Sequence, residues 1–227
     1  DKKNPEGEII KVLGKAGEHE TEMEAIVLEK GFEIGFSKEV EAEAHHLEQT
    51  EKPIPASEIA KRKDFRQTTT FTIDPKDAKD FDDAIHVEET GSGWMLSVHI
   101  ADVSHYVLPG TQLDKEARKR GNSTYLVDRV LPMLPEVISN GLASLQQGRV
   151  RYTNSVFIEF TPDGVPVHTE FAKSAIKVTQ RFAYEEVMPL IGDADSRGAR
   201  FDRAELHPDE HVGNVLHVAP NIVQLLV

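Results

Sequence analysis

The chain has 227 residues, of which 39% are apolar and 29% are charged, a composition typical of a folded globular protein with a sizeable core. It contains no cysteine, which excludes disulfides, thiolate metal sites and a cysteine nucleophile. It has neither an apolar run of about 20 residues nor a signal-peptide core, so we expect a soluble, cytoplasmic protein without a membrane partner.

The 26 basic and 39 acidic residues give a formal net charge of −13, which taken alone argues against a nucleic-acid partner. A binding track, however, needs only local positive potential. Basic residues do gather at residues 61–66 and 115–120. The simplest interpretation of both groups is a solvated helix face, so charge alone leaves the class of partner open.

The first quarter of the chain alternates short apolar segments with loops. Residues 7–13 (Gly-Glu-Ile-Ile-Lys-Val-Leu) are rich in β-branched and other apolar side chains and stop at Gly14, which predicts a strand belonging to the end of an upstream domain. Gly31 ends the first helical segment, Ser37 is a suitable N-cap for the second, and Pro53 and Pro55 break the pattern after it. Helices are predicted at residues 23–28, 37–47 and 56–64. We interpret residues 1–20 as the end of one domain and residues 21–65 as a helical linker.

The pattern changes to β from residue 67. Residues 67–73 are rich in β-branched side chains, and Pro75 lacks an N–H, so the ladder should end beside Asp74. Further along, the sequence predicts hairpins at 84–103 and 156–178, the first with one buried face. It also predicts helices at 111–119, 133–145 and 181–191. Residues 192–213 are predicted to be a polar loop and residues 221–227 a helix that is only beginning, so the chain is expected to be truncated at both ends. The fold class is mixed α/β (α+β), with antiparallel hairpins and flanking helices.

Four carboxylates crowd into ten residues: Asp74, Asp80, Asp82 and Asp83. Two carboxylates about 4 Å apart repel by roughly 4 kcal/mol at an effective dielectric near 20. A folded loop that gathers four of them either protonates some or binds a cation, and at neutral pH we expect the cation. Oxygen ligands without Cys or His suit Mg²⁺, or Mn²⁺, better than Zn²⁺. Such ions most often serve chemistry at phosphate.

The spacing of these aspartates, one Asp, five residues, a second Asp, one residue and then Asp-Asp, resembles the catalytic signature of the ribonuclease II and ribonuclease R family. The similarity continues in the order that the family shows, through residues 97–103, 110–114, 123–135 and 139–145. Residues 66–227 are therefore identified as the N-terminal half of an RNB-type catalytic domain. The first residues resemble the end of a cold-shock domain of the oligonucleotide-binding kind.

The resemblance implies a Mg²⁺-dependent, hydrolytic 3′-to-5′ exoribonuclease that degrades single-stranded RNA to nucleoside 5′-monophosphates. Asp82 matches the family aspartate tied most directly to cleavage, and the other three are expected metal ligands with it, Asp74 and Asp83 most directly. Tyr125 and Tyr184 match tyrosines that contact the RNA, where stacking a base on a ring is worth about 1 to 3 kcal/mol. The alternative for both is that they are ordinary half-buried tyrosines without a role in RNA binding.

Other expectations concern the parent protein. A later segment of the family, which carries a phosphate-holding arginine, has no counterpart in these residues, so the isolated chain is expected to be weakly active or inactive. The parent is expected to be monomeric. Whether it degrades structured RNA, as ribonuclease R does, or stalls, as ribonuclease II does, stays open. The alternative class is a noncatalytic RNA-binding or scaffold protein that retains the fold, which a degradation assay would distinguish.

Overall fold

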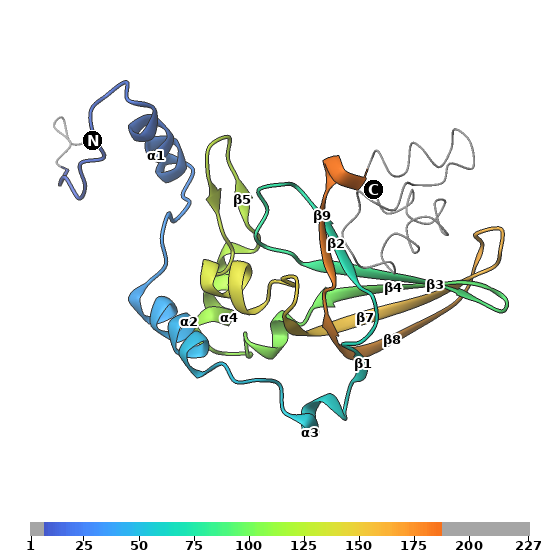
Figure 1. Ribbon diagram of the computed structural model, residues 1–227. Coiled ribbons are helices and arrows are strands. Elements are labelled where there is room, and N and C mark those ends of the chain that lie inside the picture. Colours follow the sequence, from blue (N-terminus) through green and yellow to red (C-terminus); the bar gives the residue numbers. More distant parts are fainter. Residues whose placement is uncertain (1–6, 188–227) are drawn as a thin grey trace.

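A computed structural model describes residues 7–187 of the chain (Figure 1). A seven-stranded mixed sheet has the order β1-β8-β7-β4-β3-β2-β9, and β5 and β6 form a separate two-stranded ribbon. The strands are β1 (Lys63–Phe65), β2 (Phe71–Asp74), β3 (Asp83–Thr90), β4 (Gly93–Ala101), β5 (Thr124–Tyr125), β6 (Val130–Leu131), β7 (Val150–Phe160), β8 (Pro166–Lys177) and β9 (Gln180–Ala183). The helices are α1 (His19–Glu29), α2 (Lys38–Thr50), α3 (Ala56–Ile59) and α4 (Gln112–Arg120), with a 3-10 turn at Val103–His105 and a π-helical turn at Val137–Leu142.

Both predicted hairpins are confirmed, and they form the antiparallel centre of the sheet. β3 pairs with β4, β4 with β7 and β7 with β8. The β3–β4 turn requires Gly93, whose φ is 147° and whose added Cβ would overlap the carbonyl oxygen of Phe160. The two outermost pairs are parallel: β1 runs beside β8, and β9 runs beside β2.

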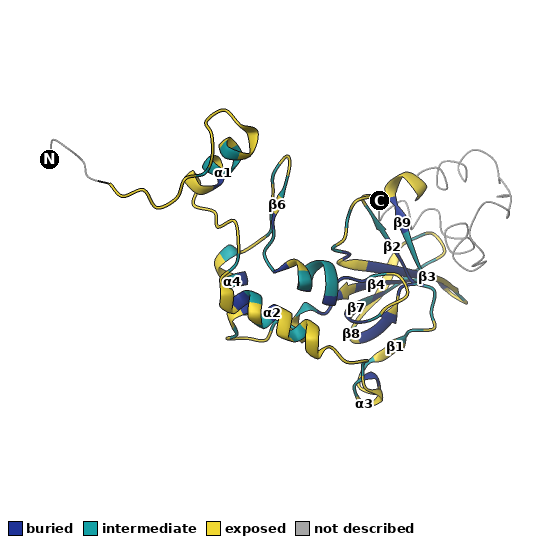
Figure 2. Cartoon of the chain, turned by 60° about the vertical axis from the view of Figure 1, so that its left-hand side comes forward, coloured by how far each residue is buried: buried dark blue, intermediate teal, exposed yellow. Residues whose placement is uncertain are grey.

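The core lies on both faces of this sheet. One cluster is built from Phe71, Ile85, Val87, Leu96 and Phe182, and a second from Phe81, Ala84, Ala101, Leu145 and Ile176. Figure 2 shows the buried residues concentrated in the sheet, whereas α1 is largely exposed. A third cluster joins α2 and α4 to the π-helical turn.

The prediction of a single buried face on β4 was wrong. Ser97 and His99 are buried, although they alternate with the apolar residues, and Ile100 is 47% exposed. The reason is that aromatic side chains also cover the second face: the rings of Phe65 and Phe157 lie 5.1 and 6.3 Å from the ring of His99. Period-two alternation reveals a half-buried strand, but this strand is covered on both sides.

The cap signals located two helices correctly. The Ser37 hydroxyl accepts a hydrogen bond from the Val40 N–H at the start of α2, and Thr111 accepts one from the Asp114 N–H at the start of α4. The third predicted helix is correct only for residues 56–59, because residues 63–65 instead pair in parallel with β8.

Other expectations needed correction. Residues 7–13 form no strand, because no described segment pairs with them to satisfy their N–H and C=O groups, and Ile10 is 95% exposed. The helix predicted at 181–191 is correct only for residues 184–187, because residues 181–183 belong to strand β9, and residues 188–191 lie outside the described part. The helix predicted at 133–145 shrinks to the π-helical turn. The loop at 192–213 and the helix at 221–227 also fall outside the described residues.

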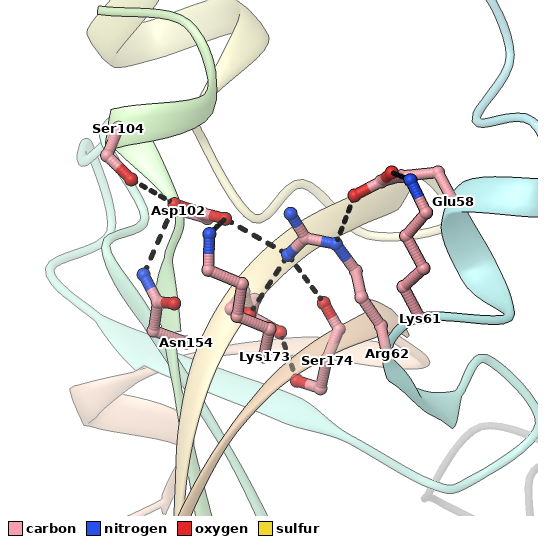
Figure 3. Close-up of polar contacts among 9 residues, drawn as sticks. Glu58, Lys61, Arg62, Asp102, Ser104, Asn154, Lys173 and Ser174 are labelled. Atoms are coloured by element: carbon pink, nitrogen blue, oxygen red, sulfur yellow. Dashed lines mark hydrogen bonds and ion pairs between the residues drawn. The ribbon is translucent and has the colours of Figure 1, made fainter. Parts of the chain in front are cut away.

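Arg62 contradicts the interpretation of residues 61–66 as a solvated face, because its side chain is only 3% exposed. Its guanidinium donates to Asp102 Oδ2 at 3.0 Å and to Glu58 Oε1 at 3.3 Å (Figure 3). Asp102 Oδ1 also accepts hydrogen bonds from Ser104, at 2.6 Å, and from Asn154, at 3.2 Å. This buried network ties α3 to the end of β4 and to β7.

Among residues 7–187, no helix combines the length and the apolar character needed to cross a membrane.

Candidate active site

The four aspartates all lie at one end of the sheet, around the loop that joins β2 to β3. Asp74 is the last residue of β2, Asp83 is the first residue of β3, and Asp80 and Asp82 lie in the loop between them. The β2 ladder ends at Asp74, which pairs with Ala183 of β9, and Pro75 follows. The position predicted for Asp74, at a strand end facing a loop, is confirmed.

Contacts from distant parts of the chain hold the second half of this loop. The Ser144 hydroxyl donates to the Lys79 carbonyl at 2.7 Å and accepts from the Phe81 N–H at 3.2 Å. The Leu145 N–H donates to the Phe81 carbonyl at 2.9 Å, and the Phe81 ring is buried in the core. Farther along, the Asp82 carbonyl accepts from the Ala101 N–H at 2.9 Å. Hydrogen bonds from Ser144, Leu145 and Ala101 therefore fix the backbone that carries Asp80 and Asp82.

Arg181 holds the first half of the loop, and sequence reasoning missed it. Its guanidinium donates to the carbonyls of Pro75, at 2.9 Å, and Lys76, at 2.7 Å. It also lies 5.1 Å from the centre of the Phe81 ring. The residue was assigned to a helix, whereas it stands on β9 opposite Thr72 of β2. The one available signal was its place in the Arg-Phe-Ala-Tyr segment that ends at Tyr184.

Burial and mutual repulsion disfavour the charged forms of these carboxylates. Burial raises the pKa of Asp74, and the negative charges of Asp83 and Asp80 act in the same direction, against the weaker lowering effects of the Thr72 hydroxyl and the Arg181 guanidinium. Partial burial also raises the pKa of Asp82, again reinforced by Asp80 and Asp83. The pKa of Asp83 is raised by partial burial. Three of the four groups therefore favour a proton or a cation more than an isolated aspartate does.

The residues present fit the chemistry of a hard divalent cation. Asp74 Oδ2 is buried and has no hydrogen-bond partner among residues 7–187, and an unpaired buried carboxylate oxygen is costly. A cation would satisfy this oxygen and offset the mutual repulsion. As the side chains stand, no three acidic or histidine groups within residues 7–187 converge closely enough to enclose one ion. The donor set is thus suitable, but the described side chains alone do not complete a coordination shell.

Both candidate tyrosines lie at the same end of the sheet. Tyr125, on β5, is 68% exposed, and its hydroxyl is 3.5 Å from Asp80 Oδ2, a long hydrogen bond. Burial and the charges of Asp80 and Asp82 raise its pKa. Figure 1 shows the β5–β6 ribbon beside the aspartate loop. Tyr184, 43% exposed, follows directly after Ala183, the partner of Asp74. The structure therefore brings the exposed Tyr125 ring to the acidic loop and places Tyr184 one residue after the strand partner of Asp74.

A curled mixed sheet with an acidic loop at one strand end and exposed tyrosines beside it defines a mixed α/β domain with a candidate metal-dependent site. The RNB domain family matches residues 62–222, and the cold shock domain family matches residues 1–37. The chain therefore belongs to the RNB domain family, as its motifs indicated, with cold-shock sequence at its start.

Similar proteins agree with this assignment. A ribonuclease R of Thermotoga maritima is 43% identical over 197 residues, covering 86% of this chain and 27% of that protein. The solved structure of Mycoplasma genitalium RNase R in complex with double-stranded RNA matches with a TM-score of 0.81 at 30% identity, over 94% of this chain and 36% of that one. Yeast Ssd1, described as a pseudonuclease, shares the fold with a TM-score of 0.66 at 22% identity, over 79% of this chain and 23% of its own. The chain thus spans about a third or less of each of these proteins.

Proposed function

We propose that the protein carrying this chain is a Mg²⁺-dependent hydrolytic exoribonuclease, which removes nucleotides from the 3′ end of single-stranded RNA and releases nucleoside 5′-monophosphates. The observation that carries the proposal is the unpaired, buried Asp74 oxygen within a cluster of four carboxylates. Membership of the RNB domain family and the relatives named ribonuclease R support it. We further propose a monomeric, cytoplasmic protein.

The four aspartates would hold the metal, with Mn²⁺ able to replace Mg²⁺. When bound, the ion supplies positive charge at the scissile phosphate and makes water a better nucleophile. In the proposed reaction, water attacks the phosphorus, the bond from phosphorus to the 3′ oxygen breaks, and the shortened RNA leaves with a 3′ hydroxyl.

Asp82 is the residue that we assign to the attacking water. Its backbone is fixed through the Ala101 hydrogen bond, so its carboxylate is held in a defined place at the loop. Asp82 would orient the water and accept its proton.

The tyrosines would bind the RNA without reading its sequence. Stacking on an aromatic ring accepts any base, which suits an enzyme that must remove every nucleotide. Tyr125 presents an open ring next to Asp80, so a base stacked there would bring its phosphate toward the carboxylates. Tyr184 would extend the same surface from the end of β9. The metal charge would offset the repulsion between the acidic loop and the RNA backbone.

The test is a degradation assay on a 5′-labelled single-stranded oligonucleotide with Mg²⁺, using the natural full-length protein. We expect shortening from the 3′ end and release of nucleoside 5′-monophosphates. Asp82→Asn should lower turnover by at least about 100-fold while RNA binding is retained, since proton transfer typically contributes that much. The matched control is Asp163→Asn, an exposed aspartate in the β7–β8 turn, which should behave as wild type.

Two results would count against the proposal. Tight RNA binding by the wild-type protein without any degradation would favour the noncatalytic RNA-binding alternative. Unchanged turnover in Asp82→Asn would remove the role assigned to this residue while leaving the reaction class intact.

A further inference from the structure

The Arg181 guanidinium lies near four carboxylates but bonds to backbone carbonyls instead. One of its nitrogens, Nη2, donates to two successive backbone carbonyls, those of Pro75 and Lys76. Among the described residues, Arg181 makes no ion pair with any carboxylate within 4 Å, although its charge limits the rise in the pKa of Asp74. The cation is therefore close enough to act on the acidic cluster, yet it leaves the carboxylate oxygens free.

The contacts divide the loop into two halves with different anchors. Ser144 and the buried Phe81 ring fix the second half, as described above. In the first half, the Ala78 N–H closes a turn onto the Pro75 carbonyl at 3.0 Å. Among the described residues, no side chain other than Arg181 donates to the Pro75 or Lys76 carbonyl. The path of the chain out of Asp74 therefore depends on this one guanidinium.

Arg181 is itself well anchored. It lies within the parallel pairing of β9 with β2, opposite Thr72, and Gln147 accepts a hydrogen bond from its backbone N–H at 3.0 Å. The guanidinium is planar and always charged, so it can bridge the two carbonyls in a fixed orientation. A lysine keeps the charge but has a flexible side chain with a compact head group, so it should reproduce this geometry only in part.

We propose that Arg181 is a positioning residue that fixes residues 75–78 in the metal-free protein and thereby preorganises the aspartates to accept Mg²⁺. The identity of the ion rests on the proposed function, but the loop clamp does not. The residue acts through Asp74, which directly precedes the segment that it holds, and needs no contact with RNA.

The first measurement is amide hydrogen exchange on the 227-residue chain in EDTA. In Arg181→Met, exchange at Ala78 should be about tenfold faster than in wild type, because hydrogen bonds to a charged group typically contribute enough for such a change. Exchange at Phe81, which Ser144 anchors, should change by less than about twofold. Arg181→Lys should give an intermediate rate at Ala78 and also serves if the methionine variant does not fold. The matched control is Arg118→Met, whose guanidinium is 71% exposed and pairs within its own helix.

The second measurement is Mg²⁺ binding by titration calorimetry on the same variants. We expect the dissociation constant to rise about tenfold in Arg181→Met, less in Arg181→Lys, and not at all in Arg118→Met. Equal exchange at Ala78 in wild type and Arg181→Met would overturn the clamp. Faster exchange with unchanged Mg²⁺ affinity would overturn the preorganisation.

Failure of the proposed function would look different from failure of this inference. A wild-type chain that binds no Mg²⁺ would contradict the metal site and, with it, the preorganisation, while the exchange rates at Ala78 would still decide whether Arg181 holds the loop.

Discussion

The buried ion pair between Arg62 and Asp102 gives the most direct test of how this fold is held together. Arg62→Met keeps much of the side-chain volume but leaves Asp102, whose side chain is 1% exposed, without its strongest partner. Among the described residues, Ser104 and Asn154 remain within hydrogen-bond distance of it, both on Oδ1, and the exposed Lys173 ammonium remains 4.0 Å from Oδ2. Breaking one side of a buried pair typically costs about 3 to 5 kcal/mol, a large fraction of the roughly 5 to 15 kcal/mol by which a domain is stable.

A double variant separates loss of packing from the penalty of an unpaired charge. Arg62→Met with Asp102→Asn removes both charges at nearly constant shape. We expect it to recover about 1 to 2 kcal/mol relative to Arg62→Met alone, since replacing both partners is much less costly than orphaning one. The control is Lys61→Met, at a neighbouring side chain that is 72% exposed, which should change the free energy of unfolding by less than about 0.5 kcal/mol.

The assay is urea unfolding at pH 7 and 25 °C, followed by the fluorescence of the single tryptophan, Trp94. Burial alone would raise the pKa of Asp102, but the Ser104 hydroxyl and the Arg62 guanidinium outweigh it, so the pKa is lowered. The carboxylate therefore stabilises the fold above its unfolded pKa near 4, and this contribution is lost as the pH falls through the lower folded value. A loss below about 1 kcal/mol in Arg62→Met, or strictly additive losses in the double variant, would refute this reasoning.

Three further predictions concern the site. Asp74→Asn in EDTA at pH 7 should raise the unfolding temperature by a few degrees, because a raised folded pKa makes the charged form destabilising above that pKa. Adding Mg²⁺ at 100 times its dissociation constant should then stabilise the wild type by about 2.7 kcal/mol in calorimetry and stabilise the variant much less. Ser144→Ala should lose about 2 kcal/mol in urea titrations because the Phe81 N–H is left buried and unpaired. Within residues 7–187 the Ser139 hydroxyl bonds only the side chain of its neighbour Asn140, so Ser139→Ala should lose less than about 0.5 kcal/mol, and equal losses in the two variants would contradict the anchor. Tyr125→Ala should weaken binding of a single-stranded oligonucleotide by about 1 to 3 kcal/mol in fluorescence anisotropy, whereas Tyr125→Phe should bind as wild type; matching losses would assign the effect to the hydroxyl instead of the ring.

Features that depend on near neighbours in the chain were predictable. The hairpins follow from alternating apolar residues and glycine turns, and the N-termini of α2 and α4 follow from the capping residues Ser37 and Thr111. Asp74 could be placed at a strand end because Pro75 cannot continue the ladder. Each of these signals lies within a few residues of the structure that it specifies.

Features that depend on distant partners were not predictable from local patterns. β9 is short and carries Gln180 and Arg181, and its strand character comes from pairing with β2. The reverse error occurred at residues 7–13, where an apolar pattern had no partner among the described residues. Arg62 and Arg181 show the same limit for side chains, because a basic residue on the surface and one that bonds to buried groups look alike in sequence.

The parallel pairing of β2 with β9 also constrains when the acidic loop can take shape. Thr70 and Thr179, which bond at the start of this pairing, are 109 residues apart in the chain. At synthesis rates of about 5 to 20 residues per second, roughly 5 to 20 s separate the two strands as they leave the ribosome. Through that interval Phe71 lacks its ring contact with Phe182, and the segment after Asp74 lacks Arg181. The β3–β4 hairpin can form from residues close in sequence, so the acidic loop reaches its final arrangement later than that hairpin, although the two are neighbours in the chain.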